Sequence, residues 1–170
     1  MAGRYNEASM SDIAELLERF RRGGEVVAVA MTGASGPQVD FVPAAGKWTA
    51  RQIVRHLADM EMLAAVRFRR VIAEDNPTLM ACDQDAWASR LYPEKPKTAE
   101  ALEMFRRLRQ ANYALLAQQP PEAFARQGMH SERGAVTLLE MVTHLAEHAE
   151  NHARQIHDIR RQYKESRAGS

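Results

Sequence analysis

The sequence has little of several features that mark particular protein classes. It contains one cysteine, Cys82, among 170 residues, which excludes an intramolecular disulfide and a cysteine-based zinc ribbon. Lys and Arg total 23 and Asp and Glu total 22, so the formal net charge is only +1. A dedicated nucleic-acid-binding protein usually carries a clear excess of basic charge, so we expect no nucleic-acid partner.

Long apolar segments are also missing. The longest notable uncharged run, residues 26–31, is far shorter than the roughly 20 residues that cross a bilayer, and residues 1–7 lack the apolar stretch of a signal peptide. We therefore expect a cytoplasmic protein with no membrane partner. Its composition, 45% hydrophobic and 26% charged, is that of a globular chain. Its length predicts a single domain, 1–170, with a core at about 11–161 and a frayed tail at 164–170.

What the sequence does contain is helical periodicity, whereas strand-like alternation is nearly absent. Apolar residues recur at helical spacing over four segments, which predict helices at about 12–31, 50–75, 99–118 and 138–161. Gly23 and Gly24 predict a bend in the first helix, because glycine weakens a helix interior. Four long helices with apolar stripes indicate an all-α four-helix bundle.

The expected helix starts carry capping residues, whose side-chain oxygens accept hydrogen bonds from free backbone amides. The predicted caps are Ser11, Thr49, Thr98 and Thr137, and two of them begin capping boxes with Gln52 and Glu140. The connection 76–97 is longer than an antiparallel helix pair needs. We expect it to hold a short helix at about 84–91 and to cross over, so that helices two and three run parallel. Residues 126–134 are expected to form a polar loop.

Histidine is concentrated near the C-terminal end, where four of the six lie between positions 144 and 157. At about 100° per residue, His152 falls at the centre of the last helix's apolar stripe and His148 at its edge. His144 is rotated toward the flank. Histidines four residues apart project side by side, as metal-binding helical pairs do. His56 lies on the shoulder of the second helix's stripe and converges on them if the two helices are neighbours.

Three imidazoles would leave at least one coordination position for water or substrate, which is the pattern of a catalytic metal site. Imidazole suits zinc, nickel, iron and copper alike, so the ligands do not choose the metal. The spacing alone also fits core histidines that each have one satisfied hydrogen bond. Asp59, one turn after His56, either orients that histidine or pairs with Arg55 on the surface. His144 is either exposed to solvent or contacts one of the metal-binding histidines without binding the metal itself.

Three segments together carry a resemblance to a known family. Lys47-Trp48-Thr49 at a helix start, followed by Ile53 and the stretch 56–59 (His-Leu-Ala-Asp), looks like the second helix of the DinB/YfiT-like superfamily. Residues 134–138 and 148–156 resemble the last helix of that superfamily, and residues 83–87 are similar to its larger branch. The resemblance covers most of the chain, from about 11 to 161. One departure is Asn151, where many members place a further histidine.

The resemblance implies an up-down-down-up bundle with a long crossover between helices two and three. It also implies one divalent metal ion, zinc or nickel with iron as a third option, at positions that correspond here to His56, His148 and His152. Asp59 and His144 are the neighbours that could support these ligands.

The resemblance further implies an enzyme, because characterised relatives are thiol-dependent transferases and isomerases that use bacillithiol, mycothiol or glutathione. We therefore expect a low-molecular-weight thiol and an electrophilic small molecule as partners. The thiol would bind the metal and attack as thiolate, so that no protein nucleophile such as Cys82 is needed. One alternative is a hydrolase that uses metal-bound water, for which a general base is missing from the obvious positions. Another is a non-enzymatic, stress-related metal-binding bundle.

Relatives often form dimers. Trp87 and Tyr92, in the crossover, are expected to offer an exposed aromatic surface to a second copy of the chain.

Overall fold

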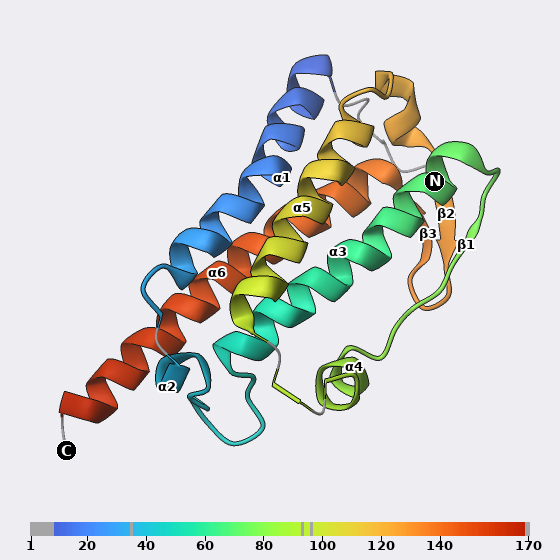
Figure 1. Ribbon diagram of the computed structural model, residues 1–170. Coiled ribbons are helices and arrows are strands. Elements are labelled where there is room, and N and C mark those ends of the chain that lie inside the picture. Colours follow the sequence, from blue (N-terminus) through green and yellow to red (C-terminus); the bar gives the residue numbers. More distant parts are fainter. Residues whose placement is uncertain (1–8, 35, 93, 96, 169–170) are drawn as a thin grey trace, which may run out of the picture.

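The computed structural model describes residues 9–34, 36–92, 94–95 and 97–168. The elements, in chain order, are α1 (Met10–Met31), α2 (Gly36–Val39), α3 (Ala50–Ala73), β1 (Thr78–Leu79), α4 (Gln84–Arg90), α5 (Thr98–Leu116), a 3₁₀ helix (Pro121–Ala125), β2 (Gln127–His130), β3 (Gly134–Thr137) and α6 (Leu138–Ala168). The helices α1, α3, α5 and α6 form a bundle (Figure 1), which confirms the predicted all-α class. None of the described helices combines the length and apolarity that a membrane span requires.

The order of helix directions is up-down-down-up, as expected. Figure 1 shows α1 and α6 running one way along the bundle, while α3 and α5 run the other way. The most extensive helix contacts join α1 to α6 and α3 to α5. Both of these pairs are parallel, so the segment between α3 and α5 has to return along the length of the bundle. The predicted crossover is therefore confirmed, and the predicted short helix within it is α4.

The start of α1 differs from the prediction. Ser9 is the N-cap, and Asp12 completes a capping box with it. Ser11 lies inside the first turn, where its hydroxyl is 2.7 Å from that of Ser9. The two glycines do not interrupt the helix, because α1 continues as one helix from Met10 to Met31.

The other helix ends confirm some predicted boundaries and correct others. Thr49 and Thr137 cap α3 and α6 through the predicted capping boxes. Thr98 is wrong as a cap, because Lys97 holds that position without a side-chain hydrogen bond and Thr98 is the first helical residue. The last helix is longer than predicted, since α6 continues beyond 161 to Ala168. Residues 169–170 lie outside the described part of the chain.

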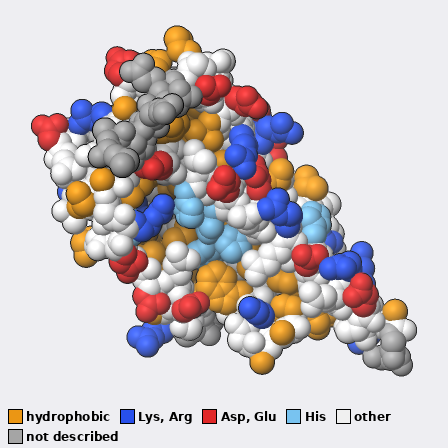
Figure 2. Space-filling model, turned by 180° about the vertical axis from the view of Figure 1, so that it is seen from behind, with side chains coloured by type: hydrophobic (Ala, Val, Ile, Leu, Met, Phe, Trp, Pro, Cys, Tyr) orange, Lys and Arg blue, Asp and Glu red, His pale blue; other side chains and the backbone are white. Residues whose placement is uncertain are grey.

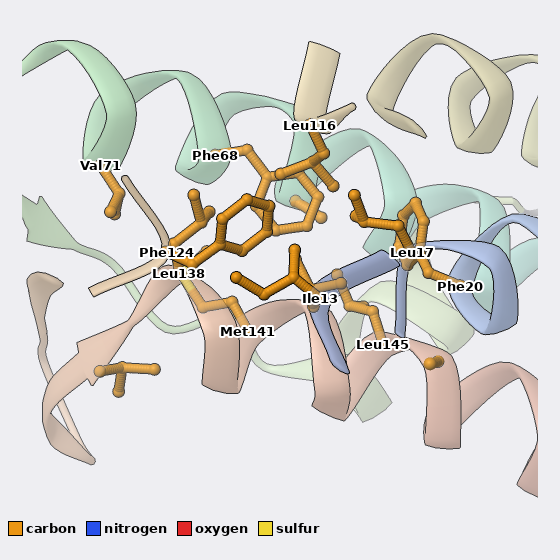
Figure 3. Packing of buried hydrophobic residues seen from close by; sticks show 14 of the residues in the cluster. Ile13, Leu17, Phe20, Phe68, Val71, Leu116, Phe124, Leu138, Met141 and Leu145 are labelled. Carbon is orange, nitrogen blue, oxygen red and sulfur yellow. The ribbon is translucent and has the colours of Figure 1, made fainter. Parts of the chain in front are cut away.

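Two apolar clusters fill the bundle core. The first cluster, shown in Figure 3, draws side chains from all four long helices into one interior. Its labelled members are Ile13, Leu17, Phe20, Phe68, Val71, Leu116, Phe124, Leu138, Met141 and Leu145. The second cluster occupies the other half of each helix and includes Val27, Ile53, Leu57, Phe105, Ile156 and Ile159. Burial of these side chains is the main favourable contribution to folding.

A buried polar layer lies between the two clusters. Arg109 of α5 donates from Nε to Glu61 Oε2 of α3 at 2.9 Å, and Asn112 Nδ2 donates to Glu61 Oε1 at 2.9 Å. The guanidinium also donates from Nη1 to the carbonyl oxygen of Phe20 at 3.0 Å. Gly23 leaves the room for this group, since a Cβ there would lie 2.5 Å from Arg109 Nη1. The glycine therefore serves close packing.

A small sheet replaces the polar loop predicted at 126–134. The strands β2 and β3 form an antiparallel hairpin, and β1 from the crossover pairs in parallel with β2. Gly128 permits this pairing, because a Cβ there would lie 2.9 Å from the Leu79 side chain. The sheet leads directly into α6 and stands beside one end of α3 (Figure 1). It therefore forms a wall next to the face on which α3 and α6 meet.

Candidate metal centre

Three histidine side chains from two helices converge on one point. His56 Nε2 of α3 lies 3.0 Å from His148 Nε2 of α6, and His152 Nε2 of α6 lies 3.1 Å from the same atom. One ring nitrogen from each of the three lies within 4.8 Å of the other two. The structure thus brings together the three imidazoles that the sequence singled out.

The packing of α6 decides how these histidines lie. Ala149 and Ala153 occupy the buried positions of the helix, and Ala149 lies against Gly23 of α1. His148 and His152 are therefore half-buried beside the apolar stripe. The prediction that His152 lies at the stripe's centre is wrong, because small residues are needed where α6 approaches α1 closely. His56 is buried on α3, and its exposed fraction is 4%.

Two of the ring-nitrogen separations, and the lowered pKa values of His56 and His148, fit a divalent cation. Two imidazole nitrogens that each lie ~2.1 Å from one ion are separated by roughly 3.0–3.4 Å, and the observed separations are 3.0 and 3.1 Å. Burial and then the neighbouring His152 lower the pKa of His56 to about 4. Burial and then the other histidines lower the pKa of His148 to about 2. At neutral pH these rings are uncharged, as metal ligands must be.

The Nδ1 atoms of His152 and His148 differ, because the first has a hydrogen-bond partner and the second has none among the described residues. His152 Nδ1 lies 2.9 Å from Gln155 Oε1. A hydrogen bond donated by Nδ1 to that oxygen leaves a lone pair on Nε2, which is the arrangement of a histidine that binds metal. His148 Nδ1 is buried and has no partner among the described residues. Sequence reasoning missed Gln155, although its spacing of three residues from His152 places both on one helix face.

Trp48 covers one side of the three histidines. Its ring centroid lies 4.8 Å from that of His56, and its plane is within 14° of that of His152 at a centroid distance of 6.4 Å. Figure 2 shows histidine side chains reaching the surface of this face, with apolar and basic side chains around them. The sequence indicated Trp48 only as part of the family resemblance. In the structure it is an apolar wall that limits the access of water.

Asp59 does not have either role that the sequence suggested. It is buried, and its Oδ1 accepts a hydrogen bond from the Tyr92 hydroxyl at 2.6 Å. Burial raises the pKa of the Asp59 carboxyl. The predicted surface pair with Arg55 is wrong, because the Arg55 guanidinium lies over the Tyr92 ring, 3.8 Å from its centroid. Among the described residues, no hydrogen bond joins Asp59 to His56. Tyr92 therefore points inward and pins the crossover to α3 instead of offering an exposed aromatic surface.

His144 lies on the flank, as predicted, and contacts one member of the trio. Its ring stacks on that of His148 with a centroid distance of 5.8 Å and an angle of 28°. Burial, followed by the nearby Arg133 cation, lowers the pKa of His144. Both effects favour the uncharged imidazole, which is the form that can accept a proton.

Comparison with known proteins gives the family of this chain. A sequence profile described as the DinB superfamily matches residues 19–156. The chain belongs to the DinB superfamily. This confirms the resemblance that the helix starts and the histidine spacing indicated.

Among relatives of this DinB-superfamily chain, a protein of Oceanobacillus iheyensis is 30% identical over 115 residues, which are 68% of this chain and 66% of that protein. YfiT of Bacillus subtilis is 28% identical over 125 residues, which are 73% of this chain and 70% of YfiT. Both carry the name "Putative metal-dependent hydrolase". The match therefore spans just under two thirds of the Oceanobacillus protein.

A solved structure of YfiT from Bacillus subtilis, described as having an unusual four-helix bundle topology, shares the fold. The two structures superpose with a TM-score of 0.87, over 96% of this chain and 94% of the other, at 22% sequence identity. At that identity the likeness establishes the fold alone.

A cavity of about 160 Å³ adjoins the histidines of this DinB-superfamily chain. Residues from α3, the crossover, the β2–β3 hairpin and α6 line it, and His148 and His144 form part of its wall. Cys82 also lines it, with Sγ 3.8 Å from Met60 Sδ, and burial raises the pKa of the thiol. The thiol is therefore protonated at neutral pH, which agrees with the expectation that Cys82 is not a nucleophile.

Proposed function

We propose that this DinB-superfamily protein is a metal-dependent hydrolase whose divalent ion is held by His56, His148 and His152. The observation that carries the proposal is the convergence of three histidine ring nitrogens from two helices, two of whose separations, 3.0 and 3.1 Å, are those that one ion would impose. The names of the relatives in Oceanobacillus iheyensis and Bacillus subtilis support the same activity.

The protein's own part is to hold the ion and shape its surroundings. A bound zinc, nickel or iron ion would supply Lewis acidity, which makes a water or a thiol nucleophilic near neutral pH and polarises a carbonyl oxygen. Three protein ligands leave at least one position for an exchangeable group. Gln155 orients His152, and Trp48 keeps one side of the site dry. The cavity beside His148 is then the place where substrate binds.

Hydrolysis also needs a group that accepts a proton from the attacking water. Asp59 is bonded to Tyr92, and Glu140 is bonded to Thr137 at the start of α6. Among the described residues that line the cavity, His144 lies against His148, and its lowered pKa favours the unprotonated ring. We assign His144 as the proton acceptor, since an imidazole of this kind suits general base catalysis near neutrality.

Thiol-dependent transfer is the second candidate, and the scarcity of carboxylates beside the site favours it. A thiol that is already deprotonated attacks without a general base, whereas water requires one. The thiolate sulfur would form a bond to an electrophilic carbon, and the leaving group would depart with the electron pair. Bacillithiol, mycothiol and glutathione are the thiols to test.

The first experiment measures metal content by mass spectrometry, on untagged protein purified without nickel resin. We expect about one divalent ion per chain, and loss of that ion in His152→Ala. His157→Ala is the matched control, because His157 is an exposed histidine of the same helix. No metal in the wild-type protein, even after incubation with zinc, nickel or iron, would overturn the proposal.

The second experiment separates the chemistries. Zinc-loaded protein is incubated with a panel of esters and amides, and separately with each of the three thiols and a panel of electrophiles. Hydrolysis that disappears in His152→Ala supports the proposal. Thiol consumption without hydrolysis would replace it with thiol transfer. Metal binding with neither activity would replace it with a non-enzymatic metal-binding role.

A further inference from the structure

The cavity beside His148 has a basic lining that the metal centre does not explain. Arg67 of α3 and Arg133 of the β2–β3 hairpin both line it. Among the described residues of its wall, Glu132 is the one carboxylate, and it is exposed. With uncharged histidines, the wall therefore carries an excess of positive charge.

Arg67 is a half-buried cation without a counter-charge. Its Nη2 donates to the carbonyl oxygen of Met80 in the crossover. Its Nε is buried with no hydrogen-bond partner, and no described carboxylate forms an ion pair with it. Burial, the largest cause, lowers the pKa of this guanidinium, and the nearby Arg133 cation lowers it further. Buried charges are normally paired, so an unpaired one points to a ligand that completes it.

Arg133 adds a second cation at the mouth of the same cavity. It is exposed, and it has no hydrogen bond or ion pair with a described residue. Both guanidinium groups line the cavity together with His130 and His144, whose pKa values are lowered first by burial and then by these two cations. Glu132 opposes them at His130.

The rest of the wall sets the shape of a ligand. Apolar side chains from four elements face the cavity, and they are Met60, Leu79, Val136, Met141 and Leu145. The volume of about 160 Å³ is below the roughly 300–1,000 Å³ of pockets for drug-sized ligands. A small molecule with an apolar body and one anionic end fits this space.

We propose that the substrate is a small carboxylate, bound by Arg67 through its anionic end and directed by the apolar wall toward His148. A carboxylate is favoured because it is planar and matches the donor edge of a guanidinium. The inference rests on the proposed function for the reaction that follows, but binding of the carboxylate itself requires only the cavity and Arg67.

The test uses protein stripped of metal and two probes of equal shape, benzoate and the uncharged benzamide. Binding is followed by chemical-shift changes in two-dimensional NMR spectra. We expect benzoate to bind about tenfold more tightly than benzamide, and Arg67→Gln to remove that preference. Arg67→Lys keeps the positive charge and is expected to retain part of the preference for benzoate. Arg107→Gln is the control, because Arg107 is an exposed arginine of α5 paired with Glu103.

Two results would overturn the proposal. The first is equal binding of the two probes by the metal-free protein. The second is benzoate binding that requires zinc and is unchanged in Arg67→Gln, since the carboxylate would then be a metal ligand. If Arg67→Gln does not fold, Arg133→Gln replaces it, with a smaller expected loss because Arg133 is exposed. Benzoate binding by a protein that takes up no zinc would remove the hydrolase proposal and leave this one standing.

Discussion

The bundle contains two clusters of polar side chains, and they differ in how completely they are satisfied. In the layer formed by Arg109, Glu61 and Asn112, the charged groups are bonded to one another or to backbone oxygens. In the histidine cluster, the Nε2 atoms face one another and His148 Nδ1 has no partner among the described residues. The first cluster is closed within the protein. The second leaves a buried polar atom without a partner among the described residues.

This difference distinguishes polar side chains that support the fold from polar side chains that are available to bind a ligand. Both clusters are buried or half-buried and both include a side chain of α3, so burial alone does not distinguish them. They differ in whether each hydrogen-bond donor and acceptor has a partner within the protein. A closed network specifies how helices pack, whereas convergent lone pairs that lack donors specify a ligand.

The largest expected effect comes from breaking the closed cluster. Glu61→Ala leaves the Arg109 cation buried without its partner, and we expect the free energy of unfolding to fall by about 3–5 kcal/mol. Urea denaturation of the metal-free protein measures this. Zinc bound per folded molecule should not change, because Glu61 does not contact the histidines.

The control for this prediction replaces both partners. The double variant Glu61→Leu with Arg109→Met is expected to recover most of the lost stability, since no charge remains buried. A single variant that is as stable as the wild-type protein would show that the layer contributes nothing to stability. A Glu61→Ala protein that folds but no longer binds zinc would erase the distinction between the two clusters.

An intermediate effect is expected from acid. The folded-state pKa values of His56 and His148 are about 4 and about 2, below the ordinary value of 6.5. Below pH 6.5 the unfolded chain therefore binds more protons than the folded one. The stability from these uncharged rings is present above pH 6.5 and is lost as the pH falls toward 4. Each ring should contribute about 2 kcal/mol to the loss between about pH 6.5 and 4.5.

Urea denaturation of the metal-free protein at several pH values checks this expectation. His56→Gln cannot take up the proton, so its stability should depend less steeply on pH over the same range. Equal slopes for the two proteins would mean that His56 is protonated equally in the folded and unfolded states, and would contradict the burial argument.

The smallest effect is expected at Gln155. Gln155→Leu removes the acceptor for His152 Nδ1 and should lower zinc affinity by about 10–100-fold, with little change in stability. Competition with a coloured chelator measures the affinity. Gln155→Glu keeps an acceptor and should retain tight binding, while Asn151→Leu controls for a polar-to-apolar change on the exposed part of α6. Equal affinities in all four proteins would show that the contact does not orient the ring.

Much of the fold could be predicted because its signals are local. The capping boxes at Thr49 and Thr137 and the apolar stripes place the helices, and the length of the crossover predicts the parallel pair. The first cap was missed although its signal is in the sequence, because Ser9 is followed three residues later by Asp12, the spacing of a capping box, whereas Ser11 is followed at that spacing by Ala14. The sheet was missed because strands of two to four residues are too short to show alternation.

In the candidate site, too, some features could be predicted from the sequence and others could not. The spacing of His148 and His152 is a property of one helix, so it could be recognised. The approach of His56 depends on which helices are neighbours, and only the family resemblance supplied that. Arg67 and Gln155 are ordinary residues of amphipathic helices in the sequence. Their roles follow from what lies opposite them, and that information exists only in the folded chain.

The parallel pairing of α1 with α6 has a consequence for biosynthesis. These two helices stand at opposite ends of the chain, and Arg19 of α1 is bonded to Glu150 of α6 across 131 positions. The first helix therefore leaves the ribosome long before its main partner exists, and contacts this distant in sequence slow folding. His148 and His152 emerge last of the three histidines. A nascent chain consequently lacks the complete histidine trio until α6 has been made, so under the proposed function it cannot hold the ion before this helix joins the bundle.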